Sequence, residues 1–230
     1  MTVPAFSTVV FDCDSTLSAI EGVDELAVDH RVEIARLTEL AMQGAVPLEE
    51  VYGRRLRLIQ PTHNDLARLA ERYVAELVPG AASVVRALQQ HGVAVHILSG
   101  GLAPAVRVVA THLGIAPINV AAVDVWFDAA GRYAGFDAAS PLTRSGGKRQ
   151  WLESAGARLT HPILLVGDGA TDLEARPAVD CFAAFTGVAR REAVVAGADV
   201  VVEGPTLEPI LRLALYGRLT PDVRTPPTGC

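Results

Sequence analysis

The sequence predicts a doubly wound, Rossmann-like α/β fold: a parallel sheet core, a helical cap inserted after the first strand, and a small β-hairpin flap. Short runs of valine, isoleucine and leucine alternate with stretches of helical periodicity, as expected when strands are buried on both faces of a parallel sheet. The first two predicted strands are separated by far more than the ~10 to 12 residues of a helical crossover, which indicates an insertion. Acidic residues directly follow two of the strands. Open α/β sheets bind their ligands at this edge.

The predicted strands are short and apolar, and they are bounded by polar residues or glycines. They cover residues 8–11, 93–98, 163–166, 181–185 and 200–202. Apolar side chains share one helical face before Gly92 and again before Gly114, and both glycines are typical of helix C-termini. Further helices are expected at 147–155, 190–196 and 207–215.

The insertion divides the chain into a core of residues 1–16 and 79–219, a helical cap of residues 17–78, and a C-terminal tail of residues 220–230. Helical patterns within the cap cover 24–31, 33–42, 48–59 and 64–77, with prolines near the boundaries. Two short strands at 123–127 and 132–136, joined by a glycine-containing turn, predict the flap.

Composition excludes several classes of protein. The 230 residues are 50% hydrophobic and 20% charged, which is enough to bury a sizeable core. The net charge of −6 offers no basic surface for nucleic acid. No apolar run approaches the ~18 residues of a spanning helix, and the N-terminus lacks a leader pattern. We therefore expect a cytoplasmic protein with a small-molecule substrate and neither a nucleic-acid nor a membrane partner.

The segment Asp12-Cys13-Asp14-Ser15-Thr16 follows the first strand. Two carboxylates this close repel each other, which predicts a divalent cation or a raised pKa. Mg²⁺ is the natural candidate because it prefers oxygen ligands. A calcium loop is excluded, because Leu17 and Val23 occupy the positions that require glycine and glutamate. Ordinary turn and cap roles for the two aspartates remain an alternative.

A second acidic loop, Gly167-Asp168-Gly169-Ala170-Thr171-Asp172, follows the strand at 163–166. It is not a dinucleotide fingerprint, because Asp172 stands at the position of the last glycine. Turn and cap roles are plausible for either loop alone. They are improbable for both, because the two strand ends meet at the same sheet edge.

Ser99 and Gly100 end the strand at 93–98 and precede a predicted helix. A hydroxyl, a glycine backbone and a helix N-terminus together favour an anion such as phosphate. A nucleophile elbow is excluded because Ile97 replaces its first glycine. The alternative is that Ser99 is a simple N-cap.

Lys148 opens another helix, directly after two glycines. A P-loop is excluded, since Leu142 and Arg149 stand where glycine and a hydroxyl residue are required. Lys148 could neutralise a phosphate. Taken alone, it would be an ordinary exposed lysine.

These four signatures, in this order, resemble the haloacid dehalogenase superfamily of Mg²⁺-dependent aspartyl-phosphate phosphatases. Within it, the cap segments are similar to those of the members that hydrolyse phosphoserine, a reaction that is the last step of serine biosynthesis. These segments are FDCDSTLSAIEGVDELA, AMQGAVP and RLRLIQP. The similarity covers residues 8–215. Thr171 departs from the asparagine of many relatives.

The resemblance implies a role for each motif residue. Asp12 is the expected nucleophile and Asp14 the general acid and base. The expected ligands of Mg²⁺ are the carboxylates of Asp12 and Asp168 and the backbone carbonyl of Asp14. Asp172 is expected to orient these ligands. The residues expected to bind phosphate are Thr16, Ser99, Gly100 and Lys148.

Specificity is expected to reside in the cap. Phosphoserine carries an ammonium and a carboxylate, which Glu21 and Arg55 match in charge, and arginine suits bidentate recognition of a carboxylate. Met42 and Gly44 are expected to line the same pocket, and a homodimer is possible by family resemblance. Without the resemblance, Glu21 and Arg55 would be ordinary helix-surface charges.

Three alternatives stay open. The first is a phosphatase for another small phosphomonoester, and the second is a phosphotransferase that passes the phosphoryl group to an alcohol. The third is a receiver-like signalling module that also carries a phospho-aspartate. A receiver, however, has no use for a long cap or for a second acid two residues after the nucleophile.

Overall fold

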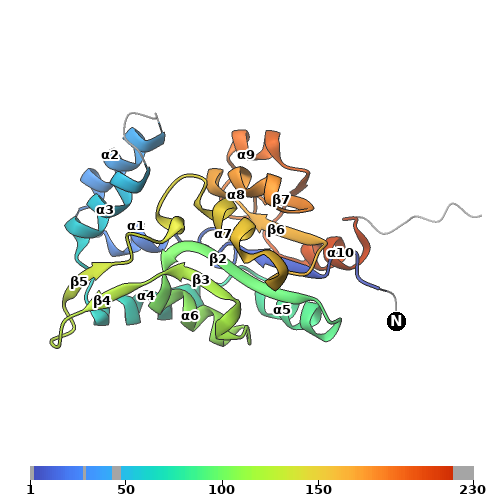
Figure 1. Cartoon of the computed structure of the whole chain (residues 1–230), viewed down its shortest axis with the longest axis horizontal. Helices are drawn as coiled ribbons and strands as arrows, with labels where there is room; N and C mark the ends of the chain where they lie inside the picture. The colour runs from blue at the N-terminus through green and yellow to red at the C-terminus, as the bar shows by residue number, and fades with distance from the viewer. Residues whose placement is uncertain (1–2, 28–29, 43–47, 220–230) are drawn as a thin grey trace, which may run out of the picture.

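The computed structural model describes residues 3–27, 30–42 and 48–219. It confirms the predicted fold class, because a six-stranded parallel sheet forms the centre of the molecule (Figure 1). The strand order is β3-β2-β1-β6-β7-β8. Its strands are β1 (Thr8–Phe11), β2 (Ala94–Leu102), β3 (Val120–Val123), β6 (Ile163–Gly167), β7 (Cys181–Phe185) and β8 (Val200–Val202).

Strand β1 lies in the middle of this sheet and pairs in parallel with β2 and with β6. All four of its residues are buried, as are all five of β6, which explains the continuous apolar runs. Because Phe11 is in register with both Ile97 and Val166, Asp12, Leu98 and Gly167 follow at the same level of the sheet.

Helices cover both faces of the sheet (Figure 1). On one side α4 packs on α6 and α5 on α10, whereas on the other α7 packs on α8 and α8 on α9. These helices are α4 (His63–Ala75), α5 (Ala81–Gln90), α6 (Ala103–His112), α7 (Gly147–Ala155), α8 (Ala170–Ala175), α9 (Glu192–Gly197) and α10 (Glu208–Tyr216). No helix in the described part of the chain is long and apolar enough to cross a membrane.

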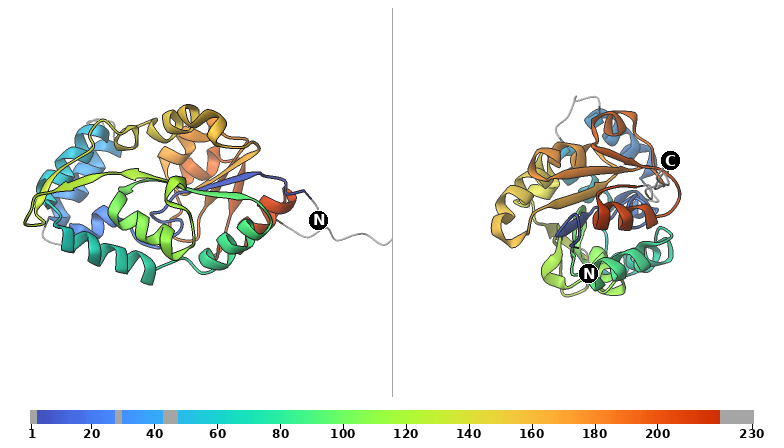
Figure 2. Two further views of the ribbon diagram at one scale, coloured as in Figure 1. Left: turned by 60° about the horizontal axis from the view of Figure 1, so that its bottom comes forward. Right: turned by 90° about the vertical axis from the view of Figure 1, so that its right-hand side faces the viewer.

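The segment between β1 and α4 contains α1 (Gly22–Leu26), α2 (Arg31–Met42) and α3 (Leu48–Ile59). The helix predicted at 24–31 is wrong in length, because α1 ends at Leu26 and α2 already begins at Arg31. Figure 2 shows α1 to α3 at one end of the molecule, and β1 runs toward that end. The acidic ends of the strands therefore face these helices. Helix α4 instead packs along α6, next to the sheet.

The end of the second strand differs from the prediction. Strand β2 continues through Ser99 to Leu102, and α6 begins only at Ala103, so Ser99 is not the N-cap of that helix. The extension pairs with β3, with an irregular register between Leu98 and Leu102. Two consecutive glycines have no side chains to pack, which lets the strand pass through this irregularity.

Strand β3 was missing from the prediction, which assigned Val123 to the flap. The flap itself is shorter, with β4 (Val125–Phe127) antiparallel to β5 (Tyr133–Phe136). Two alanines and partial burial weaken the apolar signal of β3. The predicted tail at 220–230 lies outside the described residues.

Candidate active site

Asp12 leaves the carboxyl end of β1 and is 8% exposed. Its backbone amide donates to the Val166 carbonyl (2.9 Å), and the Cys13 amide donates to its Oδ1 (2.7 Å). The next turn closes on the Cys13 carbonyl, which accepts from the amides of Leu17 and Ser18 at 3.0 Å. Backbone hydrogen bonds therefore fix the end of β1, and the Cys13 amide fixes one oxygen of the Asp12 carboxylate.

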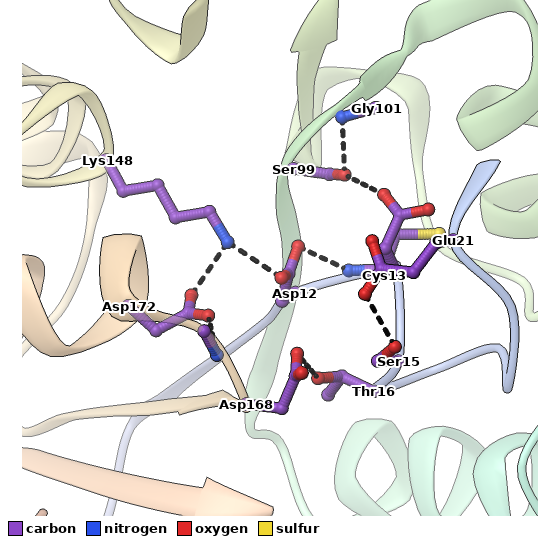
Figure 3. A network of polar contacts seen from close by, with 12 residues as sticks. Asp12, Cys13, Ser15, Thr16, Glu21, Ser99, Gly101, Lys148, Asp168 and Asp172 are labelled. Atoms are coloured by element: carbon purple, nitrogen blue, oxygen red, sulfur yellow. Dashed lines mark hydrogen bonds and ion pairs between the residues drawn. The ribbon is translucent and has the colours of Figure 1, made fainter. Parts of the chain in front are cut away.

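Lys148 lies beside this carboxylate although its helix begins more than a hundred residues later (Figure 3). Its Nζ is 2.9 Å from Asp12 Oδ2 and 2.7 Å from Asp172 Oδ1, and its side chain is only 4% exposed. A Cβ at Gly147 would lie 1.7 Å from the Pro141 carbonyl oxygen, so only glycine permits this approach. The alternative of an ordinary exposed lysine is therefore excluded.

Asp12, Asp168 and Asp172 form a buried carboxylate cluster in which one oxygen from each lies within 4.8 Å of the others. Burial raises the pKa of Asp12 to about 8; Lys148 opposes this shift, while Asp172 and Asp14 add to it. An all-oxygen set of this size fits a divalent cation of the Mg²⁺ type. The Thr16 hydroxyl donates to Asp168 Oδ1 (3.4 Å), so Thr16 contacts this cluster.

Asp14 points away from the cluster. Its Oδ1 accepts from the Gly22 amide (2.7 Å) and from Tyr73 Oη (2.5 Å), while its Oδ2 accepts from the Ser99 hydroxyl (3.3 Å). Burial and the charge of Glu21 raise the pKa of Asp14, and Tyr73 opposes the shift. A raised pKa favours the protonated form, which is the form that a general acid requires.

The Ser99 hydroxyl also accepts from the Gly101 amide (2.9 Å), and the Gly100 carbonyl accepts from Tyr52 Oη (2.8 Å). Tyr52 belongs to α3 and its ring contacts Phe136 of the flap. The end of β2, which is predicted to bind phosphate, therefore contacts α3 through Tyr52, and Tyr52 in turn contacts the flap. Burial raises the pKa of the Cys13 thiol well above its usual range, and neighbouring Asp14 adds to the shift, in agreement with an inert cysteine.

The two residues predicted to select the substrate flank α1. Glu21 precedes α1 and accepts from the Ser15 hydroxyl (2.7 Å). Arg55 of α3 pairs with Asp24 of α1, and its buried Nε has no hydrogen-bond partner among the described residues. Met42 ends α2, whereas Gly44 lies outside the described residues.

Two further residues at the site escaped prediction. Arg191, just before α9, forms an ion pair with Asp168 and lies 3.3 Å from Glu21 Oε1. It therefore connects the carboxylate cluster to Glu21. A basic residue shortly after a core strand was the available signal for it. Nothing in the sequence pattern of α4 distinguishes Tyr73 from other apolar positions on the same face.

Comparisons with known proteins find relatives along most of the chain. A family model described as haloacid dehalogenase-like hydrolase matches residues 6–180. The phosphoserine phosphatase of Bos taurus is 40% identical over 194 residues, which cover 83% of this chain and 86% of that protein. The chloroplastic phosphoserine phosphatase of Arabidopsis thaliana is 38% identical over 199 residues, covering 84% and 68%.

Solved structures share the same architecture. A phosphoserine phosphohydrolase-like protein from Francisella tularensis superposes with a TM-score of 0.76 at 25% identity, over 86% of this chain and 95% of that one. The shared fold therefore covers most of the chain.

Proposed function

Because the chain belongs to the haloacid dehalogenase-like hydrolases and is a phosphoric monoester hydrolase, we propose that it hydrolyses O-phospho-L-serine to L-serine and phosphate, the last step of serine biosynthesis. One arrangement carries the proposal. A buried aspartate is paired with Lys148, and two opposite charges lie at α1: Glu21 directly precedes this helix, and Arg55 pairs with Asp24 within it. The curated relatives named for this activity support it.

Binding depends on charge. Lys148, which contacts Asp12, and the Ser99 hydroxyl, which contacts Asp14, are proposed to hold phosphoryl oxygens together with the Gly100 amide. Glu21 is proposed to receive the substrate ammonium, and Arg55, with its spare buried Nε, the carboxylate. Met42 and Gly44 are proposed to complete this pocket.

Asp12 is proposed to attack phosphorus in line, forming an aspartyl-phosphate as the bond to the seryl oxygen breaks. Asp14 gives its proton to that oxygen, so serine leaves as a neutral alcohol. Asp14, now a carboxylate, then takes a proton from the water that hydrolyses the aspartyl-phosphate. Lys148 stabilises the negative charge on the phosphoryl oxygens throughout.

Asp12, Asp168 and the Asp14 backbone carbonyl are proposed to hold Mg²⁺, with Asp172 orienting the set. When bound, Mg²⁺ supplies positive charge to the phosphoryl group and to the crowded carboxylates. Thr16 hydrogen bonds to Asp168 and so helps to orient it.

Phosphate release from phosphoserine, phosphoethanolamine and 3-phosphoglycerate, each with and without Mg²⁺, tests the proposal. We expect the highest kcat/KM for phosphoserine and no turnover in chelator. Equal activity on all three esters would instead identify a phosphatase of another specificity. Transfer of the phosphoryl group to added glycerol in preference to water would identify a phosphotransferase, and a phospho-aspartate that persists for minutes would favour the receiver-like alternative. The cytoplasmic location and the homodimer stay predictions.

A further inference from the structure

Tyr73 is a buried tyrosine whose hydroxyl contacts the carboxyl proposed to transfer protons. It belongs to α4, is 0% exposed, and its Oη donates to Asp14 Oδ1 at 2.5 Å. A Cβ at Gly22 would lie 1.9 Å from this Oη. The phenol therefore lies between Asp14 and the start of α1, in close contact with both.

The two oxygens of Asp14 have different surroundings. Oδ1 already accepts two hydrogen bonds, one from Tyr73 and one from the Gly22 amide. Oδ2 faces the end of β2, where the Ser99 hydroxyl lies 3.3 Å away. A Cβ added at Gly101 would lie 3.0 Å from Oδ2. Oδ1 accepts two short hydrogen bonds, whereas Oδ2 accepts one longer bond from Ser99, so Oδ2 is the oxygen more available to exchange a proton with the substrate.

We propose that Tyr73 is a positioning residue that fixes the rotation of the Asp14 carboxyl, so that Oδ2 is presented to the leaving oxygen of the substrate. This inference rests on the proposed role of Asp14 as general acid and base. Without the Tyr73 hydroxyl, the carboxyl can turn about its last side-chain bond, which is a broad and soft torsion. The Gly22 amide and the longer hydrogen bond from the Ser99 hydroxyl are then the remaining contacts that oppose that rotation.

The backbone that carries Tyr73 is itself tied to the loop after β1. The Ser18 hydroxyl donates to the Tyr73 carbonyl (3.0 Å) and to the Glu76 carbonyl (3.3 Å). The Ala19 amide also donates to the Glu76 carbonyl, at 2.8 Å. These hydrogen bonds tie the end of α4 to the segment that follows Asp14 and so fix the position of the phenol relative to the carboxyl.

The test compares leaving groups that differ in their need for a proton. The seryl oxygen must be protonated as it leaves, whereas p-nitrophenolate leaves without protonation. Rapid-quench measurements of phosphoserine and stopped-flow measurements of p-nitrophenyl phosphate give the first phosphoryl-transfer step for each substrate. Tyr73→Phe removes only the hydroxyl, and Asp14→Asn provides the reference effect of losing the acid.

We expect Tyr73→Phe to slow phosphoryl transfer from phosphoserine about tenfold, equivalent to ~1.4 kcal/mol, with KM changed less than twofold. The burst rate with p-nitrophenyl phosphate should stay within twofold of wild type. Thr8→Val is the matched control, because it removes another buried hydroxyl, which donates to the Thr160 carbonyl (2.7 Å) at the opposite end of β1. It should lower the denaturation midpoint to a similar degree and leave both rates unchanged.

A second variant approaches the same hydrogen bond from the other side. Gly22→Ala places a methyl group where the Tyr73 hydroxyl now lies, and it should reproduce the selective loss with phosphoserine. It provides the test if Tyr73→Phe does not fold.

The outcomes separate this inference from the proposed function. If Tyr73→Phe slows both substrates equally, Tyr73 acts on stability alone and the inference is wrong. The inference is also wrong if Asp14→Asn is selective for phosphoserine and Tyr73→Phe is not. If Asp14→Asn itself shows no selectivity, the acid role of Asp14 in the proposed function fails.

Discussion

Replacing Lys148 by methionine should both destabilise the metal-free protein and remove its activity. Methionine has a similar length and no charge, so the change removes the ammonium with little change in volume. Lys148 is 4% exposed and its Nζ lies within 3 Å of two buried carboxylates. The substitution therefore leaves Asp12 and Asp172 facing each other without a cation.

Removing one partner of a buried ion pair usually costs about 3 to 5 kcal/mol. Burial alone would lower the pKa of Lys148, but Asp12 and Asp172 together raise it above its usual range. A base with a raised pKa stabilises the fold at every pH below the ordinary lysine value of about 10.4. Asp12 can recover by taking up a proton, since its pKa is already about 8. We therefore expect a loss of about 3 kcal/mol at pH 9 and a clearly smaller loss at pH 6.

Urea denaturation in chelator at these two pH values measures the loss. Arg149→Met is the matched control, because Arg149 follows Lys148 on the same helix and pairs with Glu153 on the exposed surface (2.7 Å). Such a pair contributes about 0.3 to 0.5 kcal/mol. A Lys148→Met loss no larger than that of Arg149→Met, or one that grows toward pH 6, would refute the reasoning.

Three other results are expected. In chelator, the free energy of unfolding should fall as pH rises from about 4 to about 8. The reason is that Asp12, with its pKa raised to about 8, holds a proton in the folded state that the unfolded chain has released. Mg²⁺ should flatten this slope, and a stability that rises with pH in denaturation experiments would contradict the idea. Asp12→Asn should abolish phosphate release while circular dichroism stays unchanged, and activity above a few per cent of wild type would remove Asp12 from the nucleophile role. Arg55→Ala should lower kcat/KM for phosphoserine at least tenfold, ~1.4 kcal/mol, and spare phosphoethanolamine. Glu21→Gln should also lower kcat/KM for phosphoserine but spare 3-phosphoglycerate. Equal losses of kcat/KM on all esters would instead assign the variant residue a role in folding or in phosphate binding.

Local sequence determined the strands and the placement of the acids. Strands buried on both faces must be apolar throughout, so β1, β6 and β7 could be found without a structure. Parallel strands release their carboxyl ends at one edge, so Asp12 and Asp168 had to lie near each other. Strand β3 was missed because it lies partly buried at the edge, where the apolar requirement is weaker.

Contacts between distant segments were decided only by the tertiary structure. Asp14 and Tyr73 are 59 positions apart, and Glu21 and Arg191 are 170 apart. A helical pattern specifies that position 73 faces the interior, and it carries no information about which group the hydroxyl meets there. That depends on how α4 packs against α6 and on how the loop after β1 turns back toward it. The orientation of the Asp14 carboxyl follows from that packing.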